Sequence, residues 1–314
     1  MKLDSNTTTF VFPGQGSQAV GMGRDLASAY PAARATFDEA DHILHFPISR
    51  LMWDGPESEL NDTINTQPAL FVHSIAAFRV LSHLHPGWQP AALAGHSLGE
   101  LSALAAAGAL SFEAGLRLVR KRGELMKKAG EMNPGSMAAI LNLDIPALEK
   151  VCAQASRGAE TVQVANDNCP GQVVISGAKA AVERAMTGAK AAGAKRAIPL
   201  AVSIAAHSNL MATIQAEWNE AVKSAAIGDA PIQVIGNVAA KPLRSAGDLC
   251  IDIQLQMQSR VRWTESIQLL AGQGITTFVE VGPGSVLLGL IKRIAPSALG
   301  QALGNPQDFE SLSV

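Results

Sequence analysis

The sequence predicts an α/β fold in which a mostly parallel sheet is interrupted by a second, smaller unit. Strand-like runs alternate with long alanine-rich helical stretches before residue 133 and again after residue 202, a pattern typical of parallel strands joined by helices. Between them the order changes to strand, helix, strand, strand, helix, strand, which is the ferredoxin-like pattern. A chain of 314 residues with 47% apolar side chains is long enough to bury a core in each unit.

The larger unit is expected to begin with a buried strand at residues 9–12. Residues 91–94 form a short strand-like run before a glycine-rich turn, but their strand propensity is weak and composition alone favours a helix there. The chain after Gly300 is expected to be loosely ordered. The remaining elements predicted for this unit are helices over residues 26–37, 68–81, 100–110, 113–129 and 287–294, a helix from about residue 210, and strands over 232–236 and 277–281.

The smaller unit is expected to be inserted into the larger one. Its predicted strands and helices cover residues 137–141, 146–155, 162–165, 172–176, 179–192 and 195–201. The sequence therefore predicts a discontinuous catalytic domain, residues 1–132 and 203–314, with a ferredoxin-like subdomain at residues 133–202.

Composition excludes several classes of function. The chain has 25 basic and 27 acidic residues, and this balance gives no basic footprint for nucleic acid or an anionic membrane. No apolar run approaches the roughly 18 to 20 residues that span a bilayer, and the first residues lack the apolar segment of a secretion signal. Cys152, Cys169 and Cys250 lack metal-ligand spacing, which favours a reducing compartment. We expect a cytoplasmic, monomeric protein without a metal.

A candidate nucleophile lies in Gly95-His96-Ser97-Leu98-Gly99. The segment matches the nucleophile elbow, in which a serine occupies a sharp turn between a strand and a helix. The pattern alone leaves two interpretations open, a catalytic Ser97 or a glycine-rich turn with a bystander serine. Of the seven histidines, His207 is the leading candidate base, because it lies in the loop where the smaller unit rejoins the larger one.

Arg122 is the most informative charged residue. On the predicted helix over 113–129 it falls within the apolar arc, whereas the other charged side chains gather on the opposite face. Burying a guanidinium is costly unless an anion meets it. Arg122 is therefore expected to pair with a protein carboxylate, as a structural ion pair, or with the carboxylate of a substrate.

Six segments, in this order along the chain, together resemble the malonyl-CoA:acyl-carrier-protein transacylases. The resemblance extends from Phe12 to the helix over residues 287–294 and implies an α/β-hydrolase-like core with a ferredoxin-like insert. The segments that carry it are Phe12-Pro13-Gly14-Gln15-Gly16-Ser17-Gln18, Thr66-Gln67-Pro68-Ala69-Leu70, Gly95-His96-Ser97-Leu98-Gly99-Glu100, Arg122-Gly123, Asn166-Asp167-Asn168-Cys169-Pro170-Gly171-Gln172 and Glu280-Val281-Gly282-Pro283-Gly284.

The resemblance implies a role for each site residue. It assigns Ser97 as nucleophile, His207 as base and Arg122 as the clamp on the malonyl carboxylate. Main-chain N–H groups of Gln15 and Leu98 would form the oxyanion hole. The remaining roles are orientation of the histidine by the Gln256 carbonyl, and a pocket lined by Gln67, Met126, Ile204 and Ala206. Neither a metal nor a cofactor is implied.

Two features of the sequence are interpreted through this resemblance. Gly14-x-Gly16-x-x-Ala19 also matches a dinucleotide fingerprint, but residues 35–41 read as helix where that fold needs a second strand ending in an acid. The glycines are better explained as letting the Gln15 N–H face a reacting carbonyl. Ala206 is smaller than the residue many family members carry next to the base, which puts strict malonyl selectivity in doubt.

The expected function is transfer of a malonyl group from malonyl-CoA to the thiol of an acyl carrier protein through a malonyl-serine intermediate, in fatty acid or polyketide synthesis. Three alternatives remain: a serine hydrolase of the lysophospholipase type, the transacylase of malonate decarboxylase, and a silent carrier-docking module. Arg122 argues against the hydrolase, because a lipid acyl chain offers no carboxylate to a buried guanidinium. An intact set of Ser97, His207 and Arg122 argues against the docking module.

Overall fold

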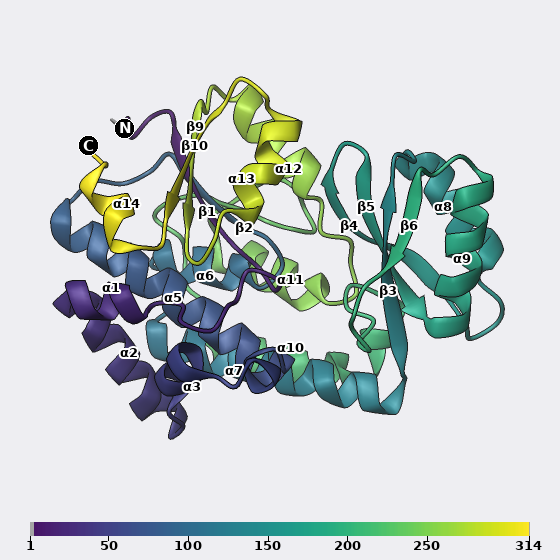
Figure 1. The fold of residues 1–314 in the computed structure, drawn as a ribbon, viewed down its shortest axis with the longest axis horizontal. Coiled ribbons are helices and arrows are strands. Elements are labelled where there is room, and N and C mark those ends of the chain that lie inside the picture. The colour runs from purple at the N-terminus through teal and green to yellow at the C-terminus, as the bar shows by residue number, and fades with distance from the viewer. Residues whose placement is uncertain (1–2, 314) are drawn as a thin grey trace.

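The larger unit is built on a six-stranded sheet, which the computed structural model, describing residues 3–313, shows at one end of an elongated molecule (Figure 1). The strand order is β10-β9-β1-β2-β7-β8; neighbours are parallel except β7 and β8. This confirms the predicted parallel sheet. The strands are β1 (Thr8–Phe12), β2 (Ala92–Gly95), β7 (Val234–Ile235), β8 (Pro242–Leu243), β9 (Thr277–Val281) and β10 (Leu299–Leu303).

Helices cover both faces of this sheet. In β1, Phe10 and Phe12 face a core shared with α5 and α7, while Val11 points into a second core formed with α12 and α13. A parallel sheet covered on both sides carries apolar residues at every strand position. The helices are α1 (Arg24–Ala29), α2 (Pro31–Leu44), α3 (Ile48–Asp54), α4 (Glu57–Leu60), α5 (Thr63–Leu84), α6 (Gly99–Ala106), α7 (Phe112–Met132), η1 (Asn209–Ile214, a 3-10 helix), α10 (Gln215–Ser224), α11 (Ala246–Gln256), α12 (Trp263–Gly272), α13 (Val286–Ile294) and α14 (Pro306–Glu310).

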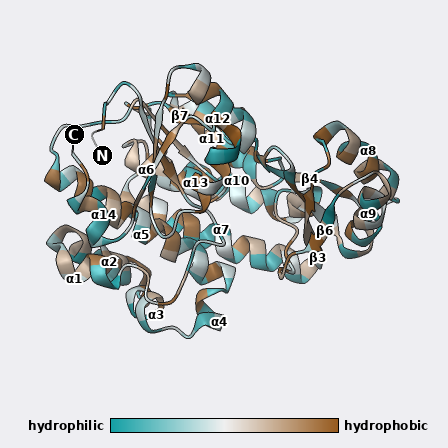
Figure 2. Cartoon of the chain, turned by 45° about the horizontal axis from the view of Figure 1, so that its top comes forward, coloured by the Kyte–Doolittle hydropathy of each residue, from teal (hydrophilic) through white to brown (hydrophobic). Residues whose placement is uncertain are grey.

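The smaller unit is an antiparallel sheet of order β4-β5-β3-β6, with α8 and α9 on one face. Its order of elements is the ferredoxin-like one that the sequence predicts. Figure 2 shows hydrophobic colour along its strands and mixed colour on α9, which has a polar outer side. The elements are β3 (Gly135–Leu141), α8 (Ile145–Ala155), β4 (Val162–Cys169), β5 (Gln172–Ala178), α9 (Lys179–Ala191) and β6 (Arg196–Pro199). The domain limits at residues 132/133 and 202/203 stay a prediction.

Two local expectations differ from the structure, and an ambiguity at residues 92–95 is resolved by it. The helix expected over residues 26–37 is two helices, because Tyr30 is extended, as residues before a proline tend to be. Residues 92–95 form a strand despite weak propensity, since they are buried between β1 and β7. The expectation of a loose tail was wrong: β10 pairs with β9 over five residues, and α14 follows it.

Glycines allow the close backbone packing at the turn that follows β2. A Cβ at Gly95 would lie 1.9 Å from the Gly99 carbonyl carbon, and one at Gly99 would lie 2.0 Å from the Phe12 oxygen. Ser97 between them has a φ of 53°, in the left-handed region. The turn is therefore the sharp elbow that the pattern predicts, and its two flanking glycines leave no room for a side chain.

We expect Gly99→Ala to lower the free energy of unfolding by about 1–3 kcal/mol, because the new methyl group must displace main chain rather than a side chain. Gly289→Ala is the matched control, since a Cβ at this position in α13 meets nothing within 4 Å. There helix propensity should raise stability, by up to about 1 kcal/mol. Urea unfolding measures the free energy of unfolding of both variants. An equal change in the two variants would contradict the idea that main-chain crowding at Gly99 excludes a side chain.

Candidate active site

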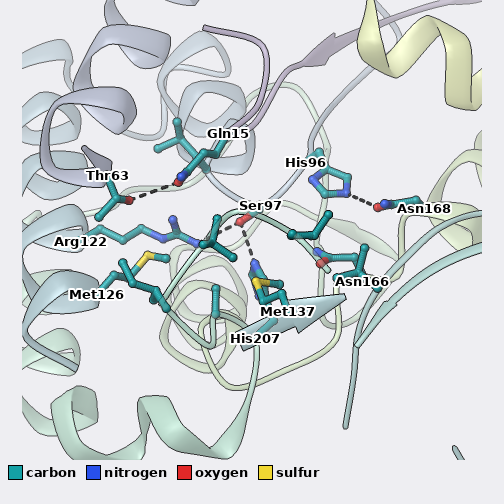
Figure 3. A pocket seen from close by; sticks show the side chains of 16 residues that line it. Gln15, Thr63, His96, Ser97, Arg122, Met126, Met137, Asn166, Asn168 and His207 are labelled. Carbon is teal, nitrogen blue, oxygen red and sulfur yellow. Dashed lines mark hydrogen bonds between the residues drawn. The ribbon is translucent and has the colours of Figure 1, made fainter. Parts of the chain in front are cut away.

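Ser97 is hydrogen-bonded to His207 across two segments far apart in the sequence (Figure 3). The Ser97 Oγ lies 2.8 Å from the His207 Nε2. The His207 Nδ1 lies 2.9 Å from the Gln256 carbonyl oxygen and 3.2 Å from that of Ser259. Because carbonyl oxygens only accept hydrogen bonds, Nδ1 carries the proton and Nε2 is left as the acceptor for the serine hydroxyl. The geometry suits a neutral imidazole that takes a proton from Ser97.

The surroundings of His207 keep it neutral. Its pKa is lowered from 6.5 to about 3, first by burial and then by the positive charge of Arg122. The two carbonyl contacts at Nδ1 oppose this shift only in part. The imidazole is therefore available as a base throughout the neutral range.

Arg122 is buried, with 2% of its surface exposed, as its place on the apolar arc of α7 predicts. Its Nη1 donates to the Gln67 Oε1 at 2.8 Å and its Nη2 to the Gln256 Oε1 at 2.8 Å. Nη2 also donates to the Ser97 Oγ at 3.1 Å. No carboxylate lies within 4 Å of the guanidinium among residues 3–313.

The guanidinium thus lacks the structural ion pair that was one expectation from sequence. Its Nε is buried without a hydrogen-bond partner in the described chain. Burial lowers the pKa of Arg122 to about 10, opposed in part by the nearby acid Glu100, and the side chain stays charged at neutral pH. A charged fork that donates only to neutral oxygens can accept an anion from outside.

Two main-chain N–H groups are free near the Ser97 hydroxyl. Neither the Gln15 N–H nor the Leu98 N–H has an acceptor within residues 3–313, and both residues line the same cavity as Ser97. The Ser97 N–H is taken by the Asn237 Oδ1 at 2.8 Å. Gly14 allows the Gln15 loop to approach the elbow closely, since a Cβ there would lie 2.5 Å from the His96 oxygen.

The cavity above Ser97 has a volume of about 240 Å³. Met126, Ile204 and Ala206 line it, whereas Gln67 lies behind Arg122 and not on the wall. The smaller unit supplies part of the wall through the face of its sheet opposite α8 and α9. Sequence analysis gave no wall role to the other lining residues, Thr63, His96, Met137, Asn166, Asn168, Val174, Leu200 and Val202.

His96, Asn166 and Asn168 belong to the segments that carry the family resemblance, but the sequence did not indicate which residues they would contact. The His96 Nε2 lies 2.8 Å from the Asn168 Oδ1, and its ring meets Trp263 edge-on. Burial lowers the pKa of His96. Its position beside the cavity was not predicted, because the contact joins residues 72 apart in the sequence.

Comparison with known proteins agrees with this geometry. The family model described as an acyl transferase domain matches residues 9–302. The malonyl CoA-acyl carrier protein transacylase of Bacillus subtilis (strain 168) is 46% identical over 301 residues, which cover 96% of this chain and 94% of the relative. That of Escherichia coli (strain K12) is 44% identical over 298 residues, 95% of this chain and 96% of the relative. The chain belongs to the malonyl-CoA:acyl-carrier-protein transacylase family.

Solved structures of this family share the fold. An acyl carrier protein S-malonyltransferase from Vibrio cholerae superposes with a TM-score of 0.94 at 43% identity, covering 97% of this chain and 99% of that one. A malonyl-transacylase solved in complex with its type II PKS acyl-carrier protein gives a TM-score of 0.93 at 41% identity, with 97% and 98% covered. Membership in the transacylase family makes the chain an acyltransferase.

The transacylase shows no group of three or more His, Cys, Asp or Glu side chains within residues 3–313 that could hold a metal ion. None of the helices in that part of the chain is both long and apolar enough to cross a membrane.

The low pKa of His207 predicts a loss of stability in acid. Between pH 6.5 and about 3 the unfolded chain binds a proton at His207 that the folded chain does not, so the free energy of unfolding falls as the pH falls through this window. Replacing His207 by glutamine should therefore make the fall less steep. Urea unfolding from pH 7 to 4 measures the slope, with the exposed His83→Gln as control; an unchanged slope in the His207 variant would contradict a neutral buried imidazole.

Proposed function

We propose that this chain transfers a malonyl group from malonyl-CoA to the phosphopantetheine thiol of an acyl carrier protein through a malonyl-Ser97 intermediate. One observation carries the proposal: the Ser97 Oγ lies between the His207 Nε2, at 2.8 Å, and the Arg122 Nη2, at 3.1 Å. A base on one side suits attack on a thioester, and a cation on the other suits an acyl group that ends in a carboxylate.

Acylation begins when His207 takes the Ser97 proton and the serine oxygen attacks the thioester carbon. The tetrahedral oxyanion accepts hydrogen bonds from the free N–H groups of Gln15 and Leu98. Gln256 holds the imidazole in the tautomer that this step needs, as the acid of a triad does elsewhere. Protonated His207 then gives its proton to the departing sulfur of coenzyme A.

Transfer to the carrier repeats these steps in reverse order. The phosphopantetheine thiol gives its proton to His207 and attacks the malonyl-Ser97 ester, and the serine leaves with the proton. All of these steps use side chains and main-chain N–H groups, and the chemistry as written includes no cofactor or metal. The solved complex of a related malonyl-transacylase with a type II PKS acyl-carrier protein supports a carrier as the acceptor.

Selection of malonyl rests on Arg122. The walls contributed by Met126, Ile204 and Ala206 are apolar, so a charged acyl terminus is favoured only near the guanidinium. A bidentate contact to carboxylate matches the planar fork of arginine. The hydrolase alternative gives this buried cation no role, and the relatives do not favour it.

Ser97→Ala should abolish both malonylation and transfer, because a methyl group cannot attack a thioester. Intact-mass spectrometry after mixing with malonyl-CoA should show one malonyl adduct on the parent protein and none on the variant. Adding holo acyl carrier protein should then remove the adduct. Turnover in the variant would exclude Ser97 as nucleophile, and an adduct lost to water before the carrier is added would favour a hydrolase.

Arg122→Ala should lower malonyl transfer sharply while acetyl transfer holds steady or rises. Loss of one partner of a buried charge pair costs about 2–5 kcal/mol, which corresponds to roughly 30-fold or more in malonyl kcat/KM. An acetyl group has no carboxylate to leave unpaired. Arg122→Lys should restore only part of the activity, because an ammonium lacks the two-point contact.

The measurement is the ratio of malonyl to acetyl kcat/KM in the parent and each Arg122 variant. Arg120→Ala is a matched control, since this arginine lies on the same helix but pairs with Glu124. An equal fall for both substrates in Arg122→Ala would show that the residue supports the fold and does not select the acyl group.

A further inference from the structure

Two acids are buried beneath the elbow, and the mechanism above uses neither. Glu100 follows the elbow on α6 and is 1% exposed, while Asp252 on α11 is 4% exposed. No lysine, arginine or histidine nitrogen lies within 4 Å of either carboxyl group in residues 3–313. Two buried negative charges without a neighbouring cation would be costly. The hydrogen bonds of the two carboxyl groups indicate how this cost is avoided.

Every oxygen of the pair accepts an N–H. The Glu100 Oε1 accepts from the Asn237 main chain at 3.3 Å and its Oε2 from the Gln256 Nε2 at 2.6 Å. The Asp252 Oδ1 and Oδ2 accept from the main chains of Ala239, at 2.8 Å, and Val238, at 3.1 Å. The three main-chain donors belong to consecutive residues, Asn237, Val238 and Ala239, so the two carboxyl groups are held side by side.

Two buried carboxylates side by side repel each other, so the pair is stabilised when one of them holds a proton. Asp252 has two main-chain donors to stabilise a negative charge, whereas Glu100 has one main-chain donor and one side-chain amide. The proton therefore belongs on Glu100. Burial, followed by the charge of Asp252, raises the pKa of Glu100 well above its ordinary value, in agreement with the geometry.

We propose that Glu100 and Asp252 form a buried acid pair that shares one proton, and that its single negative charge balances Arg122 when the acyl pocket holds no carboxylate. Gln256 connects the two sides. Its Nε2 donates to the Glu100 Oε2, which turns its Oε1 toward the Arg122 Nη2 at 2.8 Å. The same Nε2 donates to the Ser97 carbonyl oxygen at 2.9 Å.

The pair thereby acts on Arg122 without touching substrate. Arg122 interacts electrostatically with Glu100, and Arg262 interacts with Asp252. A malonyl carboxylate brings a second negative charge to Arg122. The negative charge already on the acid pair partly neutralises the guanidinium and so weakens its binding of the malonyl carboxylate. Glu100 and Asp252 are positioning residues that set how tightly the guanidinium binds the acyl carboxylate; this consequence rests on the proposed function, whereas the shared proton does not.

The shared proton can be tested without any activity. At pH 9 the infrared spectrum should contain the carbonyl band of one protonated carboxylic acid in the parent and none in Glu100→Gln. Asp252→Asn should also lose the band, because Glu100 then takes over the negative charge. Glu280→Gln is the matched control: Glu280 is another buried acid, on β9, with its pKa raised to about 7 by burial, so it is ionised at pH 9.

A band that is absent from the parent, or that persists in Glu100→Gln, would overturn the protonated Glu100. A band that persists in Asp252→Asn would show that burial alone keeps Glu100 neutral, and would overturn the sharing of one negative charge. These results leave the adduct test on Ser97 unaffected, so failure of the acid pair and failure of the transferase proposal are distinguishable.

The balance of charge is tested by the ratio of malonyl to acetyl kcat/KM. Each single variant keeps one negative charge, so Glu100→Gln and Asp252→Asn should change the ratio by no more than about 3-fold. The double variant keeps none, and its ratio should rise by at least about 10-fold, a coupling within the range for residues of one hydrogen-bond network. The proposal would be contradicted if the ratio in a single variant equalled that in the double variant, or if the ratio in the double variant equalled that in the parent. If the double variant does not fold, the infrared spectra of the single variants decide.

Discussion

The burial of one positive charge organises the centre of this protein. Arg122 reaches from α7 to the Gln67 amide on α5, the Gln256 amide on α11 and the Ser97 hydroxyl at the elbow, so one guanidinium joins three other parts of the larger unit. It makes these bonds with neutral oxygens. A cation held by neutral groups in an apolar wall interacts strongly with any anion that enters, because little water screens the charge.

Much of the fold could be predicted because its signals are local. Alternating strands and helices, and the six-element order of the insert, follow from periodicity in short windows. The sequence was ambiguous or misleading where tertiary contacts override local propensity. Residues 92–95 are a strand because β1 and β7 flank them, and the chain after Gly300 is ordered because the exposed edge of β9 provides partners for β10.

In the candidate site, too, the features that could be predicted are local, and those that could not depend on contacts between distant segments. Helical geometry alone indicated that Arg122 is buried, and the loop position of His207 indicated a base, while the resemblance supplied Gln15, Leu98 and Gln256. Asn237 was not predicted: its amide accepts from the Ser97 N–H and donates to the Gly95 oxygen, across more than 130 residues. Gln67 was expected on the pocket wall and lies behind Arg122. Such pairings arise from how distant segments meet, and no pattern in one segment encodes them.

The insert forms the second wall of the site with the face of its sheet that does not pack against its own helices. The four-stranded sheet packs α8 and α9 on one face, and the side chains of Met137 and Val174 on the other face line the cavity. Because His207 follows the last strand of the insert, the base and this wall are connected by a short stretch of chain, which also carries Leu200, Val202 and Ala206. A change in the packing of β3 against β6 would therefore alter the shape of the pocket and the approach of His207 to Ser97 together. In the proposed mechanism, selection by acyl size and proton transfer would therefore depend on one segment, whereas the acyl charge would be recognised separately by Arg122 on α7.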